Sequence, residues 1–370
     1  MGVKNMDENI DNRWDSIWFS SFCTENEIDR IINPQKPIDF LLRERADIVA
    51  DNIRYQRVYM NKARRNKRWT FESSFNVYHY NSVLNRLSKD DKFACKNFTY
   101  GDMFSNDVNG YAWNDEKWGR FVSLNESLQF YMKFCNLAIL EFREHVPNYV
   151  RMNALRIAIR VMLKQEAMDF YMDPRGIVPY KIGKEIHRPI KYELQYIAGH
   201  EFAHHLCGHL DDKNLTKKMM LKIGDKEYYK PIYNISQLQE MEADIASLVR
   251  PEYRDKEYIE LLQGALIWFI SLELAERAQN IINPALAFDI KTHPSSDERY
   301  NYILENVKIP DDFDLKYIEK IKENAKIMDE CLEKDLSDNY DIYDFYGSCY
   351  LDKPNTEWRG KQLIDRVDYY

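Results

Sequence analysis

A short histidine-rich run constrains this chain more than any other feature. Four of its eight histidines lie within ten residues, between His200 and His209. His200, Glu201 and His204 form the pattern H-E-x-x-H. Because an α-helix turns about 100° per residue, side chains at positions i and i+4 lie on the same face. Two imidazoles in that arrangement can bind one Zn²⁺, and Glu201 beside them can reach a water on that metal. The run therefore predicts a helix that carries half of a zinc site.

The composition is typical of a folded, water-soluble protein. The chain has 370 residues, of which 45% are hydrophobic and 14% aromatic, so it can bury a large core. Charged residues make up 30% of the chain, and the mean hydropathy is −0.61. The formal net charge of −8 argues against nucleic-acid binding by the surface as a whole, so we expect nucleic acid not to be a partner.

Cysteine usage and apolar patterning indicate the cellular compartment of the protein. Its six cysteines are scattered without a C-x-x-C pair, which predicts free thiols in a reducing compartment. The first residues lack the apolar core of a signal peptide. The most apolar stretch, 264–273, is about half as long as a membrane span and predicts a buried helix. We therefore expect a cytoplasmic protein without a membrane span.

The chain reads as three regions without a linker between them. Residues 1–100 read as a helical N-terminal region, and 101–310 as a core that contains the histidine motif. Residues 311–370 read as a helix followed by an acidic, aromatic strap that packs on the core, since a free tail would carry fewer aromatic residues. We expect a predominantly helical α+β fold.

Within the predicted core, hydrophobic periodicity and turn residues place the elements. We expect a short strand at 119–124, and we expect the motif helix to begin at Arg188-Pro189, since proline suits the first turn of a helix. Residues 211–235 predict a loop or small hairpin. Ser295 and Glu298 have the spacing of a capping box and predict a helix that begins there. Further helices are expected at about 126–143, 149–171, 237–248 and 257–278.

A basic stretch interleaved with aromatic residues runs from Arg54 to Trp69. Such a stretch can bind an acidic partner or nucleic acid. A solvated helix face is the simpler interpretation, and the acidic balance of the whole chain favours it.

The third protein ligand of a catalytic zinc distinguishes the classes of H-E-x-x-H site. In the metzincin pattern, a glycine and then a histidine follow the second motif histidine at fixed spacing. Here Cys207 and Leu210 occupy those positions, so the metzincin interpretation fails. His205 and His209 are out of register for ligation, and we expect them to be surface or helix-end histidines.

A later acidic segment supplies the alternative third ligand. Glu240 and Asp244 are four residues apart and share a helix face, whereas Glu242 points roughly opposite to Glu240. We assign Glu240 to the metal. We assign Asp244 to the N–H of a zinc-bound histidine, which such a carboxylate orients. An ordinary acidic helix face is the simpler alternative in a chain with 60 Asp and Glu residues.

His293 precedes the helix that Ser295 is expected to cap. A histidine on such a turn can lean into a cleft and donate a hydrogen bond to a developing oxyanion. Arg299, in the first turn of that helix, can assist it or can pair with Asp244 or another carboxylate. For His293 taken alone, a capping or core role is the simpler interpretation.

In this order the motifs resemble the HtpX and CAAX-prenyl-protease branch of the gluzincin metallopeptidases. The resemblance rests on His200–His204, on an E-x-E-A-D run containing Glu240, and on Thr-His-Pro at 292–294 followed by Arg299. The segment from Asn109 resembles that branch's Asn-Ala-Phe-Ala strand loosely, since the alanine is replaced by glycine. Members of the HtpX type are membrane proteins, so a soluble relative is implied. Lit-type phage-exclusion peptidases also carry this motif in a cytoplasmic chain, which suggests a bacterial defence or toxin-like peptidase.

The resemblance implies a zincin-like core and a zinc-dependent endopeptidase acting on a protein or peptide. His200, His204 and Glu240 would hold one Zn²⁺, and Glu201 would act as general base on a zinc-bound water. His293 would stabilise the oxyanion, and the strand at 120–124 would pair with the substrate backbone. Two alternatives stay open, namely a non-catalytic zinc-binding regulator or scaffold and a zinc hydrolase of a non-peptide amide or ester.

Overall fold

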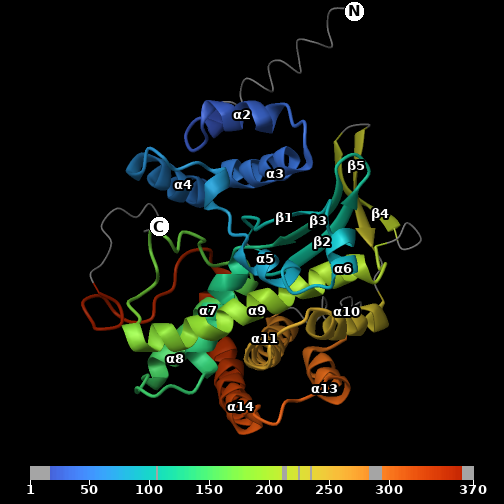
Figure 1. Ribbon diagram of the computed structural model, residues 1–370. Helices are drawn as coiled ribbons and strands as arrows, with labels where there is room; N and C mark the ends of the chain where they lie inside the picture. Colours follow the sequence, from blue (N-terminus) through green and yellow to red (C-terminus); the bar gives the residue numbers. More distant parts are fainter. Residues whose placement is uncertain are drawn as a thin grey trace, which may run out of the picture.

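The computed structural model describes residues 17–105, 107–210, 215–223, 226–233, 236–282 and 294–360, with 215–223 and 226–233 described as backbone only. The described chain is predominantly helical and contains a three-stranded sheet and a two-stranded hairpin (Figure 1). Its α-helices and strands are α2 (Glu25–Ile32), α3 (Pro37–Asp51), α4 (Ile53–Arg65), α5 (Tyr78–Leu84), α6 (Lys89–Ala94), β1 (Thr99–Tyr100), β2 (Gly110–Asp115), β3 (Gly119–Leu124), α7 (Ser127–Ile139), α8 (Asn148–Met162), α9 (Tyr180–Leu206), β4 (Leu215–Ile223), β5 (Lys226–Tyr233), α10 (Gln237–Val249), α11 (Asp255–Ile282), α13 (Ser296–Asn306), α14 (Leu315–Asp338) and α15 (Tyr340–Asp344).

The helix that carries the histidine motif is longer than expected. The sequence predicted a start at Arg188-Pro189, but α9 begins at Tyr180 and contains Pro189 in its interior. Proline breaks one backbone hydrogen bond of a helix. Ile182, Ile186 and Ile190 are buried at four-residue spacing along one face. Continuous burial of that face keeps the helix intact through the proline.

The sheet lies between helical layers, with α3 against one face and α9 against the other (Figure 1). Its strand order is β1-β3-β2, so β3 is the central strand and pairs with β1 in parallel and with β2 in antiparallel. The prediction that the strand at 120–124 pairs with the substrate backbone is therefore wrong, because both edges of β3 pair with neighbouring strands. Within the described residues, β2 is paired on one side only.

The helix α11 crosses α9 at a glycine. A Cβ added to Gly264 would lie 2.8 Å from the backbone nitrogen of Glu193, so only glycine lets the two backbones approach this closely. Residues 264–271 are all buried, which confirms the buried helix predicted there. By length and composition α11 could cross a membrane, and 67% of its most apolar window is buried inside the structure. Because a core helix passes the same criteria, the absence of a membrane span stays a prediction.

The helix α8 ends earlier than the sequence suggested. It stops at Met162, nine residues before the predicted end at 171, with Lys164 at a φ of +62°. The backbone amides of Lys164 and Gln165 close that end by donating to the carbonyls of Val161 and Arg160. Glycine usually occupies such a left-handed position, so a lysine there gave no sequence signal for the end of the helix.

A buried ion network holds the C-terminal segment on the core. Arg160 and Arg175 are 0% exposed, and their Nε atoms donate to the two carboxylate oxygens of Glu166 at 2.8 and 2.6 Å. The backbone N–H of Cys349 donates to the same carboxylate. The predicted C-terminal helix is α14, and the predicted strap contains the end of α14 and the short helix α15. In the described part that follows, residues 345–360 form no helix or strand. The segment 211–235 contains a hairpin of β4 and β5, one of the two forms expected for it.

The six cysteines are free thiols in the structure, as expected from their spacing.

The basic stretch forms α4 and the turn after it. Arg54 pairs with Asp169 at 3.2 Å, so part of this stretch packs on the protein. Four further cations are exposed: Arg64, Arg65, Lys67 and Arg68. An acidic partner for them stays a prediction.

Glu193 predicts an unusual pH dependence of stability. Glu193 is a residue of α9, and the burial of its side chain raises the pKa of the carboxyl to about 8, although a hydrogen bond from Asn136 opposes the shift. Between the carboxyl's ordinary pKa and pH 8, the unfolded chain ionises while the folded chain keeps the proton. Folding therefore loses stability as the pH rises through that window. Glu193→Gln should raise the free energy of unfolding by a few kcal/mol at pH 8.5 and far less at pH 5.

Urea denaturation at the two pH values measures this difference. Glu305→Gln, at an exposed position on α13, is the control and should change neither value. An equal gain for Glu193→Gln at both pH values would contradict the assignment of the shift to burial.

Candidate metal centre

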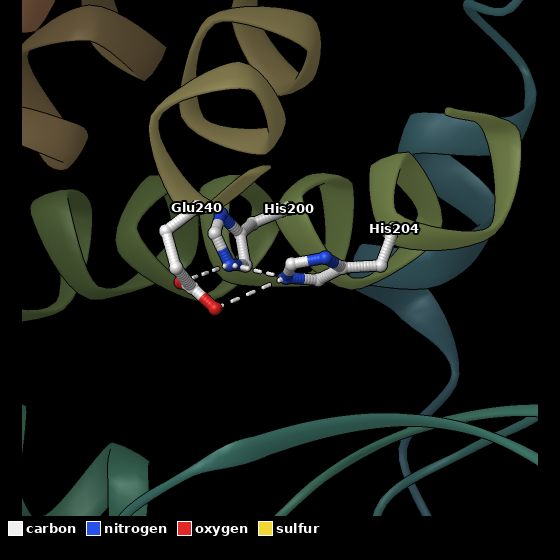
Figure 2. Close-up of side chains that lie close together, drawn as sticks. All are labelled: His200, His204 and Glu240. Carbon is white, nitrogen blue, oxygen red and sulfur yellow. Dashed lines mark hydrogen bonds and ion pairs between the residues drawn. The ribbon is translucent and has the colours of Figure 1, made fainter. Parts of the chain in front are cut away.

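Two histidines of α9 and one glutamate of α10 converge as a compact group (Figure 2). The Nε2 atoms of His200 and His204 are 3.0 Å apart. Glu240 places one carboxylate oxygen 3.4 Å from Nε2 of His200 and the other 3.7 Å from Nε2 of His204. The three residues are 7%, 3% and 4% exposed, respectively. Distant stretches of the chain thus bring two imidazoles and one carboxylate together.

These spacings fit a metal ion. Ligand atoms bound at 2.0–2.1 Å around a tetrahedral zinc lie about 3.3 Å from one another. The observed separations of 3.0, 3.4 and 3.7 Å bracket that value. The buried His200-His204-Glu240 group can therefore hold a metal ion.

The close crossing of α9 and α10 explains how the carboxylate reaches the imidazoles. A Cβ added to Gly199 would lie 3.3 Å from Cβ of Ser247, so a small residue is needed at the crossing. Ala203, Ala243 and Ala246 form a buried cluster between the helices. Ser236 caps α10 through a capping box with Gln239, which puts Glu240 in the first turn of that helix.

Asp244 lies directly behind His200. Its Oδ1 is 2.9 Å from Nδ1 of His200 and accepts a hydrogen bond from the Tyr196 hydroxyl at 2.7 Å. Arg299 donates to both carboxylate oxygens, at 2.7 Å to Oδ2 and 2.6 Å to Oδ1. Burial raises the pKa of Asp244, but Arg299 and His200 outweigh it and lower the pKa to about 2. Asp244 is therefore a fixed buried anion behind the ring of His200.

The electrostatic environment of the two imidazoles favours a cation between them. Burial lowers the pKa of His200, but Asp244 and Glu240 outweigh it and raise that pKa to about 10. Burial and the neighbouring His200 hold the pKa of His204 well below its usual value. The carboxylates thus draw one positive charge to a place where two imidazoles lie in contact.

Glu201 faces the start of strand β2. It is 7% exposed. A Cβ added to Gly110 would lie 2.7 Å from Oε1 of Glu201, so the carboxylate lies against the strand backbone where a larger residue would meet it. Further along β2, Asn114 donates to the backbone carbonyl of Leu210 at 2.9 Å, so the strand also contacts the segment just after the end of α9. Gly110 and Asn114 are on one face of β2, since alternate residues of a strand share a face.

The two neighbouring histidines lie at the end of α9 and in the turn that closes it, which is one of the two places expected for them, but neither is on the surface. His205 is 6% exposed and its Nε2–H donates to the carbonyl of Phe121 at 2.9 Å, which ties α9 to β3. His209 is 2% exposed, and its Nδ1 lies 3.0 Å from Nδ1 of His204. Its Nε2 lies 3.2 Å from the carboxylate of Glu242, a residue that sequence reasoning set aside.

Of the remaining predicted site residues, Arg299 is on α13, which begins with the predicted capping box of Ser295 and Glu298. The guanidinium pairs with Asp244, one of the two roles expected for it, and lies 3.6 Å from Glu240. His293 lies outside the described residues.

Comparisons with protein-family models, with curated proteins and with solved structures find no match to this chain. The resemblance to the HtpX and CAAX-prenyl-protease branch therefore rests on the motifs themselves. The structure adds the buried His200-His204-Glu240 group, which can hold a metal ion.

The buried pair of Arg299 and Asp244 should be essential for stability. Arg299→Gln would remove the guanidinium that compensates the buried charge of Asp244, which should lower the free energy of unfolding by about 3–5 kcal/mol. Urea denaturation in the presence of a chelator measures this loss without any contribution from metal binding. Arg277→Gln is the control, because Arg277 pairs with Asp329 on the surface and is 50% exposed. Arg277→Gln should lower the free energy of unfolding by less than about 1 kcal/mol. Equal losses in the two variants would contradict a structural role for the buried pair.

Proposed function

We propose that this protein is a zinc-dependent endopeptidase with a zincin-like core of the gluzincin type. The observation that carries the proposal is the convergence of His200, His204 and Glu240, with Glu201 adjacent in sequence to a ligand. Three protein ligands are the usual complement of a catalytic zinc, whereas structural zinc usually takes four ligands rich in cysteine. The donor set of two imidazoles and one carboxylate suits zinc.

Each residue has a separate part in the proposed reaction. Bound zinc supplies Lewis acidity, which lowers the pKa of a water from about 15.7 toward ~7. Glu201 accepts a proton from the attacking water and delivers it to the leaving amine nitrogen, so that amide and water become acid and amine. Such proton transfer contributes roughly 10²–10⁴ to the rate. Asp244 holds the imidazole of His200 in one orientation. We propose His293 as an oxyanion donor on its sequence position alone.

The sheet supports a peptide rather than a smaller amide or ester as substrate. Within the described residues β2 has one unpaired edge, and its first residue, Gly110, lies against Glu201. An extended peptide can add to such an edge through its backbone. We propose β2, in place of the central strand β3, as the strand that aligns the substrate. We further propose that the protein acts inside the cell on a protein target.

Glu201→Gln tests the catalytic assignment. The amide keeps the size of the side chain but cannot accept the proton, so turnover should fall by at least about 10²-fold while zinc content and stability stay unchanged. The measurement is cleavage of a denatured-protein mixture, followed by mass spectrometry, beside zinc quantification. Glu305→Gln is the matched control and should leave both unchanged. Zinc binding without cleavage by the wild-type chain would favour the non-catalytic regulator or scaffold. Cleavage of amide or ester probes alone would favour the non-peptide hydrolase.

Gly110→Ala tests the approach of β2 to Glu201. The added methyl would meet Oε1 of Glu201 and Cδ2 of Leu124, 2.7 and 2.8 Å from the new carbon. Moving the carboxylate should lower kcat by about tenfold or more, since small displacements of a catalytic group are costly, and should leave zinc affinity unchanged. Gly183→Ala is the control, because a Cβ there has no atom within 4 Å. Unchanged turnover in Gly110→Ala would contradict the placement of β2 beside the reacting groups.

A further inference from the structure

His209 connects the candidate metal centre to a surface carboxylate. Its Nδ1 is 3.0 Å from Nδ1 of His204, on the side of that ring opposite to the metal-facing Nε2. Its Nε2 is 3.2 Å from Oε2 of Glu242. His209 is 2% exposed, whereas the side chain of Glu242 is 61% exposed. Three side chains thus form one line from solvent to the metal-facing atom of His204.

We infer that His209 and Glu242 position His204 for metal binding by fixing its tautomer and ring orientation. An imidazole that gives Nε2 to a metal carries its proton on Nδ1. Nδ1–H of His204 then donates to Nδ1 of His209. This leaves the proton of His209 on Nε2, where it donates to Glu242. Each nitrogen in the line has one defined role, and only one arrangement of protons satisfies all of them.

The end of α9 builds this contact. Gly208 has a φ of +74°, and its N–H donates to the carbonyl of His205. The N–H of His209 donates to the carbonyl of His204 at 2.9 Å. These two bonds define a Schellman motif, which brings the residue after the glycine back over the helix position five residues earlier. The glycine therefore returns His209 to the second metal-binding imidazole.

A second metal site is the competing interpretation, since Cys207, His209 and Glu242 also offer ligand atoms close together. A metal on Nε2 of His209 would place the proton of that ring on Nδ1. That proton would face Nδ1–H of His204 across 3.0 Å, with no acceptor between them. Occupancy of the first site therefore opposes a second metal here, and the geometry favours the positioning role.

Both metal-binding imidazoles then have a partner on the far side of the ring, but of different kinds. His200 has the buried Asp244, which Arg299 compensates. His204 has a neutral imidazole backed by a solvated carboxylate. The inference rests on the metal centre of the proposed function but does not require peptidase activity.

Zinc affinity, measured by competition with a chromophoric chelator, tests the inference. His209→Leu should weaken binding about 10–100-fold. His209→Asn should stay within about threefold of wild type, because its amide oxygen can occupy the place of Nδ1 and accept from His204. Glu242→Gln keeps an acceptor without the charge, changes an exposed residue, and should weaken binding a few-fold. The visible spectrum of the Co²⁺-substituted protein should shift in His209→Leu and return in His209→Asn.

Two controls separate positioning from loss of a buried ring or a surface charge. His205→Leu removes the adjacent buried imidazole and should leave zinc affinity and the Co²⁺ spectrum unchanged. Glu305→Gln removes an exposed carboxylate from α13 and should also change neither.

Three results would overturn the inference. The first is an unchanged affinity in His209→Leu, and the second is an equal loss in His205→Leu. The third is binding of two zinc ions by the wild type with loss of one in Cys207→Ser, which would establish the second metal site. Any of these leaves the role of Glu201 standing if Glu201→Gln alone abolishes cleavage, whereas a wild type that binds no zinc overturns both proposals.

Discussion

The crossing of α9 and α10 is the constraint on which the site depends. Small residues at the crossing let the helices approach, and the approach places Glu240 against two imidazoles four residues apart. The same crossing buries Asp244, a charge that would be costly in the interior without a partner. Arg299 from α13 supplies that partner. A third helix is therefore required to make the two-helix arrangement stable.

Much of the centre was predictable because its chemistry follows helical periodicity. The four-residue spacing that paired His200 with His204 also paired Glu240 with Asp244, and the structure brings the first three of these residues together. The helix position of Arg299 was predictable because a capping box indicated the start of that helix, and the sequence left two roles open for this residue. Local patterns of this kind depend on few residues and little tertiary context.

The incorrect predictions arose where tertiary contacts or backbone conformation decide. Strand order depends on which segments pair, so the sequence could indicate β3 as a strand but not as the central one. Burial carried α9 through Pro189 although proline is an ordinary signal for a helix start. The helix α8 ends close to Lys164, which has a left-handed backbone conformation. A glycine at that position would have indicated the end of the helix, but a lysine does not. Neither the strand order nor the conformation of Lys164 leaves a periodic trace in the sequence.

His209 is a different case, because its signal was present. Gly208 stands where a helix of this register ends, and a glycine at that position returns the next residue to the preceding turn. A search for ligands alone passes over His209, since it lies five residues after His204 and shares no face with it. The turn at the end of α9 brings His209 into contact with His204, which helical spacing alone does not do. A complete account of a helical metal motif therefore includes the residues that follow the end of the helix, because they lie behind its last ligand.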